Sequence, residues 1–389
     1  MPSIEHLRSL TLDLPPSCVE FWPDDEHYAV VGTYNLESEV PAQDAPKPTT
    51  QRRNGSLILL HVEGDDVHIA QTFSTPSAIL DLHFGTLHCR KNLFGVATST
   101  GSIGIYQLKD ERDSHMYREP SMHPRMEHIK TVEYFPDDVL ITAFSWHPTD
   151  LSVGMTLSTG QVCLGKIDLR EDVSCASSVE LAAHDLEAWT LAFLPDGSGA
   201  YSGGDDSALQ FAEVTVNWEY HQDHSVQPEN GAPRKMPWMD KKIHGAGVTA
   251  ILPLHSDEQR GLVLTGSYDD HIRLINAPAA GRRTVLAEMN LGGGVWRLKR
   301  LDVQTTSVIP ADQVPTEVLL LASCMHAGTR IVSLSQSGKN EWQFEVLAQF
   351  EEHKSMNYGS DCQPGLNEKG QRTFVTTSFY DRLLCLWRY

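Results

Sequence analysis

Short apolar runs separated by polar turns recur along the chain. The stretch HGAGVTAILPLHSDEQRGLVLTGSYDDHIRLINAP, residues 244–278, contains three such runs, each of strand length. Residues 183–214, AHDLEAWTLAFLPDGSGAYSGGDDSALQFAEV, have the same layout, with a Pro-Asp-Gly turn signal between the first two runs. The pattern predicts three strands joined by two turns in each stretch. Its recurrence predicts a protein built from small, repeated antiparallel sheets.

Weaker copies of this unit fill the rest of the chain. A unit begins with a His, continues with an apolar strand and a turn, and then has a small-residue strand before an Asp and an outer strand. This order resembles the WD repeats of β-propellers, which recur every ~40–45 residues. The resemblance implies one all-β domain over residues 1–389, a seven-bladed WD-repeat β-propeller. The expected blades are 18–62, 76–108, 138–167, 183–214, 243–278, 292–334 and 351–389.

The two ends of the chain are expected to close the ring together. The last unit stops after its third strand, at Tyr389, and the strand-like run LRSLTLDL (7–14) precedes the first blade. Pairing of 7–14 with the last blade would remove an open sheet edge, which is a site of aggregation. A long segment of mixed charge, 215–242, is expected to be a surface insertion loop.

Composition restricts the class of protein further. The hydrophobic content of 40%, with 28 Gly and 21 Pro, is typical of an ordered, turn-rich chain. The start has no basic segment followed by an apolar one, and no apolar run approaches the ~20 residues that span a bilayer, so we expect a cytoplasmic protein that does not bind membranes. The formal charge of −20 argues against nucleic acid and favours a basic partner. We expect a monomer.

The seven cysteines are scattered and include no CxxC pair. They fit reduced thiols better than a disulfide or zinc framework. We also find no metal-type Cys/His spacing, so no metal and no cofactor are expected.

The aspartates at the second turn of each unit have a structural interpretation. In WD repeats such an Asp commonly hydrogen-bonds the His that opens the blade, and buried polar groups normally occur in satisfied sets. The expected pairs are Asp206 with His184, Asp269 with His244, and Asp381 with His353.

The residues around these turns are candidates for function. Strand alternation directs the residue before each Asp elsewhere, toward one mouth of the central channel. These residues are Asp205, Tyr268 and Tyr380, and the loops that begin the blades bring Glu187, Trp189, Trp296, Arg297, Tyr358, Ser360 and Asp361 to the same side. Packing at the rim is the alternative interpretation for the aromatic residues, and a solvated carboxylate is the alternative for Glu187 and Asp205.

One blade departs from the common pattern. In LLLASCMHAGTRIVSL, His326 takes the position of the structural Asp, and the preceding loop NLGGGVWR has no His to pair with it. A free His at a channel rim is a candidate general base or acid, with a repacked blade as the alternative. Cys324, two residues earlier, is a candidate nucleophile, although it replaces small residues of other blades and also fits an inert core thiol.

Several segments together resemble one family. AHDLEAW, YSGGDD, TGSYDDHI, GGGVWR, CMHAG and SFYDRLLCLW look like the diphthine methylesterases of the diphthamide pathway, over roughly residues 181–389. The resemblance implies hydrolysis of the methyl ester of methylated diphthine, on translation elongation factor 2, to diphthine and methanol. The chain has no G-x-S-x-G or H-E-x-x-H motif, so a hydrolase mechanism of the α/β type is not expected.

The resemblance suggests roles for the rim residues. His326 would activate water, oriented by Glu187 or Asp205, while Tyr268, Tyr380 or Arg297 would donate to the oxyanion. The substrate's trimethylammonium group would be held by aromatic faces and carboxylates. The aromatic faces are those of Trp189, Trp296, Tyr268, Tyr358 and Tyr380, and the carboxylates are those of Asp205, Glu187 and Asp361. The alternative is a non-catalytic scaffold that docks elongation factor 2 or another protein client.

Overall fold

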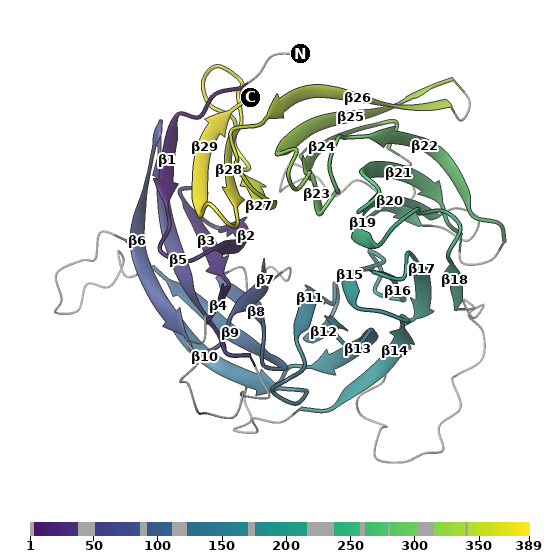
Figure 1. Ribbon diagram of the computed structural model, residues 1–389, viewed down its shortest axis with the longest axis horizontal. Helices are drawn as coiled ribbons and strands as arrows, with labels where there is room; N and C mark the ends of the chain where they lie inside the picture. Colours follow the sequence, from purple (N-terminus) through teal and green to yellow (C-terminus); the bar gives the residue numbers. More distant parts are fainter. Residues whose placement is uncertain are drawn as a thin grey trace, which may run out of the picture.

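The seven expected blades are present as seven antiparallel sheets arranged in a ring (Figure 1). The computed structural model describes residues 4–37, 51–85, 92–110, 123–169, 176–215, 237–256, 261–278, 281–301, 315–338 and 341–389. Every regular element within these ranges is a β-strand, so the all-β, seven-bladed propeller is confirmed. The described residues contain no helix long and apolar enough to cross a membrane.

In every blade four main strands follow one another from the channel outward. In that order, blades 1 and 2 are β2 (Pro16–Phe21), β3 (Tyr28–Thr33), β5 (Arg53–Glu63) and β6 (Asp66–Thr75), then β7 (Ile79–Phe84), β8 (Leu93–Thr98), β9 (Ser102–Lys109) and β10 (Arg125–Glu133). Blades 3 and 4 are β11 (Ile141–Trp146), β12 (Ser152–Leu157), β13 (Gln161–Lys166) and β14 (Ser178–Ala183), then β15 (Ala188–Phe193), β16 (Gly199–Gly204), β17 (Leu209–Glu213) and β18 (Trp238–Asp240). A two-residue strand, β4 (Asn35–Leu36), also pairs with β5.

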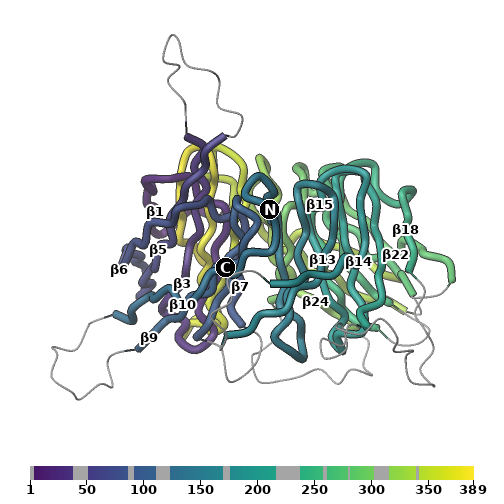
Figure 2. Tube along the Cα trace, turned by 90° about the horizontal axis from the view of Figure 1, so that it is seen from below, coloured from purple at the N-terminus to yellow at the C-terminus, as the bar shows by residue number. Residues whose placement is uncertain are grey.

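The other three blades complete the ring. Blades 5 and 6 are β19 (Val248–Ser256), β20 (Gly261–Ser267), β21 (His271–Asn276) and β22 (Thr284–Asn290), then β23 (Arg297–Arg300), β24 (Glu317–Ser323), β25 (Thr329–Ser337) and β26 (Glu341–Phe350). Blade 7 is β27 (Asn357–Cys362), β28 (Thr373–Ser378), β29 (Leu383–Arg388) and β1 (Arg8–Thr11). In the side view the blades stand next to one another around the ring (Figure 2).

The fourth strand of most blades lies beyond the units expected from the sequence. Those units ended at the third strand because the outer strands are too polar and too exposed to form an apolar run, as in β6, DVHIAQTFST. The segment 215–242, expected to be a loop, ends in β18, the outer strand of blade 4. Residues 216–236 of that segment, including Trp218, lie outside the described residues.

The N-terminal strand closes the ring as expected. β1 pairs antiparallel with β29, and Figure 1 shows it as the outermost strand of blade 7. Leu12, just after β1, is 1% exposed and belongs to a core cluster with Val375, Leu384 and Leu386. Blade 7 is therefore built from both ends of the chain.

The core lies between neighbouring blades. One buried cluster joins Val30, Leu57 and Leu59 of blade 1 to Ile79 and Phe94 of blade 2. The strands of each blade alternate in direction, so the loop before every inner strand and the turn between its second and third strands reach the same end of the ring. We call this end the mouth face.

Candidate functional site at the channel mouth

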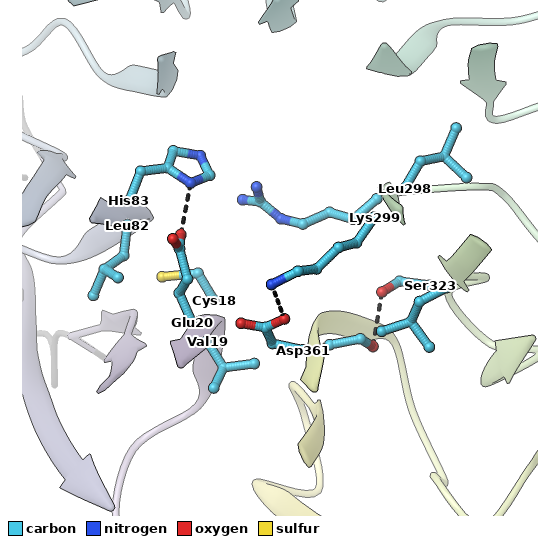
Figure 3. A pocket seen from close by; sticks show the side chains of 12 residues that line it. Cys18, Val19, Glu20, Leu82, His83, Leu298, Lys299, Ser323 and Asp361 are labelled. Atoms are coloured by element: carbon cyan, nitrogen blue, oxygen red, sulfur yellow. Dashed lines mark hydrogen bonds and ion pairs between the residues drawn. The ribbon is translucent and has the colours of Figure 1, made fainter. Parts of the chain in front are cut away.

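A charged cavity lies in the central channel. It measures about 250 Å³, and its charged lining comes from four inner strands, with Glu20 on β2, His83 on β7, Arg297 and Lys299 on β23, and Asp361 on β27 (Figure 3). Side chains two residues apart on a strand share a face, which places Arg297 and Lys299 on the same side of β23. The inner strands thus direct charged groups toward the cavity.

His83 connects two carboxylates. Its Nδ1 lies 2.8 Å from Glu20 Oε2, and its Nε2 lies 3.2 Å from Asp81 Oδ2. Asp81 is 1% exposed and also accepts hydrogen bonds from Arg297 Nη2 at 2.6 Å and from the backbone N–H of Phe144 at 3.2 Å. The result is a continuous polar chain, Glu20–His83–Asp81–Arg297.

The charges in this chain stabilise one another. Burial alone would lower the pKa of His83, but the charge and hydrogen bond of Asp81, together with Glu20, outweigh it and raise the pKa to about 10. Burial likewise opposes ionisation of Asp81, yet Arg297 and His83 lower its pKa well below the usual range. At neutral pH the site therefore holds an imidazolium and a guanidinium next to ionised Asp81.

Two further N–H donors belong to this charged cluster, the ammonium group of Lys299 and the Nε of Arg297. Lys299 forms an ion pair with Asp361, and although burial would lower the pKa of Lys299, Asp361 outweighs it and raises the pKa. Asp361 is 1% exposed and accepts the backbone N–H groups of Phe21 and Cys362, each at 2.7 Å. Arg297 Nε is buried and has no hydrogen-bond partner among the described residues. Its hydrogen-bonding capacity is therefore unused within the protein.

Aromatic side chains gather at the mouth face next to this cavity. Trp296, which directly precedes Arg297, lies at their centre, with ring centroids 4.9 Å from Tyr358, 5.7 Å from Trp189 and 6.1 Å from Tyr268. Phe379 lies 5.6 Å from Tyr358 and 5.1 Å from Tyr380, which is 70% exposed. We call the aromatic rim the set Trp189, Tyr268, Trp296, Tyr358, Phe379 and Tyr380.

Carboxylates lie beside the aromatic rim. Trp189 Nε1 donates to Asp205 Oδ1 at 3.3 Å. Burial, followed by the effects of Tyr358, Asp205 and Glu187, raises the pKa of Tyr268, which places both acidic groups in its surroundings. The rim combines flat aromatic faces with negative charge, and this combination suits a cationic ligand.

The structure separates residues that the sequence grouped together. Trp189, Asp205, Tyr268, Trp296 and Tyr358 do meet, through the ring contacts and the hydrogen bond of the rim. Arg297 and Asp361 instead form ion pairs within the channel, Arg297 with Asp81 and Asp361 with Lys299.

Neither His326 nor Cys324 has the surroundings that its proposed catalytic role requires. His326 is exposed in the turn after β24 and, among the described residues, makes no hydrogen bond or ion pair with Glu187 or Asp205. Cys324 is fully buried, and burial raises the pKa of its thiol to about 12. That environment fits the inert core thiol.

The expected Asp–His pair forms in one of the three blades. His184 Nδ1 lies 2.9 Å from Asp206 Oδ1, as predicted. In blade 5 the prediction is wrong, because Asp269 is held by Arg273 and by the backbone N–H of Gly245.

Blade 7 differs in a similar way. Asp381 accepts the hydroxyl groups of Ser355 and Ser378, both at 2.6 Å, so the expected bond to His353 is absent. His353 Nε2 is instead paired with Thr376 Oγ1 at 2.8 Å, and the equivalent pair in blade 5 is His244 with Thr265. Nearby hydroxyl and guanidinium donors satisfy the aspartates in place of the imidazoles.

Sequence reasoning missed Glu20, Asp81, His83 and Lys299. A sequence pattern nevertheless marks these residues. In CVEFW, ILDLHF and VWRLKR, charged residues alternate with apolar ones inside predicted inner strands. In a ring of blades such positions face the central channel. Hydrophobic alternation identifies these positions once the place of each strand in its blade is known.

Comparisons with known proteins give a family-level match. The chain is 26% identical to the diphthine methyltransferase of Saccharomyces cerevisiae, over 98% of this chain and 97% of that protein. It is 27% identical to that of Schizosaccharomyces pombe, over 94% of each, and 26% identical to that of Homo sapiens, over 91% of this chain and 74% of the human one. No family model matches. The chain is thus related to the diphthine methyltransferases of diphthamide biosynthesis.

Solved structures support the fold. A chain of the mitotic checkpoint complex has a TM-score of 0.60 at 15% identity and covers 100% of this chain and 92% of its own length. Sqt1 from Chaetomium thermophilum, bound to the N-terminus of the ribosomal protein L10, has a TM-score of 0.56 at 13% identity, over 96% and 84%. At these identities the likeness is one of fold alone.

Proposed function

We propose that this chain, a family-level relative of the proteins named diphthine methyltransferase, hydrolyses the methyl ester of methylated diphthine on translation elongation factor 2. The products would be diphthine and methanol. One observation carries the proposal: the aromatic rim, with its carboxylates, adjoins a cavity whose donors are cationic, and Trp296 and Arg297 join the two in sequence.

The aromatic rim suits one end of this substrate. Methylated diphthine carries a quaternary trimethylammonium group close to its ester. Such a cation cannot donate a conventional hydrogen bond, so it is recognised by aromatic faces and nearby negative charge. Trp296, Tyr268 and Tyr358 offer the faces, and Asp205 and Glu187 supply the charge.

The charged cavity suits the other end. When water attacks the ester carbonyl, negative charge develops on the carbonyl oxygen and remains on the product carboxylate. The guanidinium side chain of Arg297 lines the cavity, and the raised pKa of His83 keeps its imidazole a cation at neutral pH. Both groups favour the transition state and the product over the neutral ester.

Glu20 is our candidate for the base that activates water. Its carboxylate lines the cavity, remains partly exposed and is oriented by His83 at 2.8 Å. Glu20 would take one proton from water while the water oxygen bonds to the carbonyl carbon. The tetrahedral intermediate would then collapse, the bond to the methoxy oxygen would break, and methanol would leave with that proton. His326, exposed at the mouth face, remains the competing base.

The names of the relatives favour a second candidate, methyl transfer to diphthine. Transfer needs a methyl donor and adds one methyl group to the modified residue, whereas hydrolysis needs only water and removes one. The two reactions change the mass of elongation factor 2 in opposite directions. A docking role without chemistry would change nothing.

We also propose that the chain acts as a cytoplasmic monomer on elongation factor 2. The formal charge of −20 favours approach to a basic surface of that partner. This steering would weaken as ionic strength rises.

A multiple-turnover assay tests the proposal. Purified protein is mixed with a molar excess of elongation factor 2 bearing methylated diphthine, and the modified peptide is followed by mass spectrometry. We expect many esters to be cleaved per enzyme, with a large loss of kcat in Glu20→Gln. The matched variant His326→Ala should keep its activity. Full activity in Glu20→Gln with none in folded His326→Ala would reject our assignment and support the sequence-based base.

A further inference from the structure

Three histidines far from the channel mouth lie close together. His61 is on β5, His68 is on β6, and His123 precedes β10. One ring nitrogen of each lies within 4.8 Å of those of the other two. We propose that these three imidazoles bind one divalent transition metal ion of the zinc class.

The geometry is close to that of a metal site. His61 and His68 are direct cross-strand partners in the β5–β6 hairpin, and their ring centroids are 4.8 Å apart. The His123 ring lies 5.0 Å from that of His61 and 5.5 Å from that of His68. Tetrahedral ligands with Zn–N bonds of about 2.0–2.1 Å stand roughly 3.3 Å apart. The exposed His68 side chain is free of core packing, and small rotations of the three rings would bring their nitrogens to that spacing.

A buried nitrogen at this cluster has no partner. His61 Nδ1 is excluded from solvent and has no hydrogen-bond partner among the described residues. A buried polar atom left unpaired is costly, and a metal bond would remove the cost. This second observation distinguishes the cluster from a chance grouping of surface histidines.

The surroundings fit a metal-bound histidine set. Tyr28 packs against His61 with ring centroids 4.9 Å apart, and its hydroxyl lies 3.2 Å from His123 Nδ1. Ligating histidines usually engage their second nitrogen in such a contact, which fixes the ring orientation. Glu63, two residues after His61 on β5, adds a negative charge on the same face of that strand. Imidazole is a preferred ligand of zinc and its neighbours in the transition series.

The place of the cluster separates it from the candidate catalytic site. β2 starts at the mouth face, so β3 begins and β5 ends near the opposite face, where Tyr28 and His61 lie. The ion would tie the outer hairpin of blade 1 to the segment that leads into β10 of blade 2. Gln71 of β6 and Met126 of β10 already join the two blades by hydrogen bonds of 2.9 and 3.4 Å. The site would thus strengthen a contact between neighbouring blades.

Metal content and spectroscopy test this proposal. The full chain is loaded with Zn²⁺, dialysed and analysed for metal, and a second sample is titrated with Co²⁺, whose visible spectrum reports its coordination. We expect one ion per chain and a rise in melting temperature with Zn²⁺. His68→Ala, which removes an exposed side chain, should weaken binding at least as much as the loss of an outer-shell partner does, about 10- to 100-fold.

A matched variant and a second ligand variant complete the test. His326→Ala removes another exposed histidine, outside the cluster, and should bind one ion as the unaltered chain does. His61→Gln should abolish the Co²⁺ spectrum while the protein retains a cooperative melt. Equal binding in His68→Ala and the unaltered chain, or no retained ion in the unaltered chain, would overturn the proposal.

Discussion

Deleting residues 1–14 should destabilise the whole propeller, because this segment supplies the outermost strand of the last blade. Backbone hydrogen bonds anchor both of its ends, from Leu7 N to Leu386 O at 2.7 Å and from Leu12 N to Arg382 O at 2.8 Å. The Leu12 side chain is 1% exposed within a cluster formed by the two chain ends. Without the strand, β29 becomes an exposed edge.

The size of the effect follows from these contacts. Burial of one Leu side chain contributes about 1.5–3 kcal/mol, and each backbone hydrogen bond about 0.5–1.5 kcal/mol net. Loss of Leu12 and several hydrogen bonds therefore removes on the order of 5 kcal/mol, out of a typical total of 5–15 kcal/mol. At about 2.1 cal/mol/K per residue, an unfolding entropy of roughly 0.8 kcal/mol/K for this chain converts that loss into a Tm lower by about 6 °C.

Point substitutions give a cleaner assay than the deletion. Leu12→Ala should cost about 2–5 kcal/mol, since it leaves a cavity in the closing cluster. Leu7→Ala makes the same chemical change at a side chain that is 42% exposed, and should cost far less. Melting is followed by circular dichroism and differential scanning calorimetry. Equal melting temperatures for Leu12→Ala and the unaltered chain, or for the deletion and the full chain, would refute closure by this strand as a source of stability.

Three further predictions concern the channel and its mouth. Trp296→Ala should raise KM for methylated diphthine by roughly 5- to 30-fold, the equivalent of about 1–2 kcal/mol of cation–π attraction, and an unchanged KM would exclude the aromatic rim as the cation site. Because the pKa of His83 is raised to about 10, its contribution to stability should be complete below about pH 6.5 and lost as pH rises through about 10. Melting curves of His83→Asn should lack this decline, and a parallel decline in the variant would disprove it. Cys324→Ser should retain esterase activity because the thiol is buried, and a folded but inactive variant would restore it as the nucleophile.

The sequence predicted the fold well because propeller blades are local units. Each blade has its own hydrophobic alternation and its own turns, so short windows such as 244–278 contain the information needed to recognise it. Closure by residues 7–14 was also accessible, since a final blade lacking a strand must find one elsewhere. The outer strands were missed because half-exposed strands such as β6 and β10 lack a strong apolar pattern.

The candidate site was only partly accessible, for a geometric reason. The aromatic rim was found because Trp296 and Tyr268 come from a loop and a turn, and Tyr358 from the start of an inner strand, and the position of each in a blade is fixed. The charged channel was missed because its ion pairs join blades that are far apart in the sequence, as when Arg297 of blade 6 pairs with Asp81 of blade 2. No single repeat shows that pairing.

The histidine cluster illustrates the same limit. His61 and His68 are cross-strand partners in one hairpin, but His123 joins them from the next blade. The three histidines do not show the spacing of a metal-binding motif along the chain, but they lie close together in space. Contacts between repeats depend on the closed ring, and the pattern within one repeat does not reveal them.

The most direct test of the proposed function is hydrolysis of methylated diphthine on elongation factor 2 in water enriched in oxygen-18. If water attacks the ester carbonyl, the product carboxylate gains one oxygen-18 atom and methanol carries none. The protein then loses the mass of one CH₂ group less the mass by which oxygen-18 exceeds oxygen-16. Methyl transfer to diphthine would raise the mass and leave the label out, and a docking protein would leave the substrate unchanged. We predict the labelled carboxylate in many-fold excess over enzyme, and its absence would contradict the assignment of this propeller as a diphthine methyl ester hydrolase.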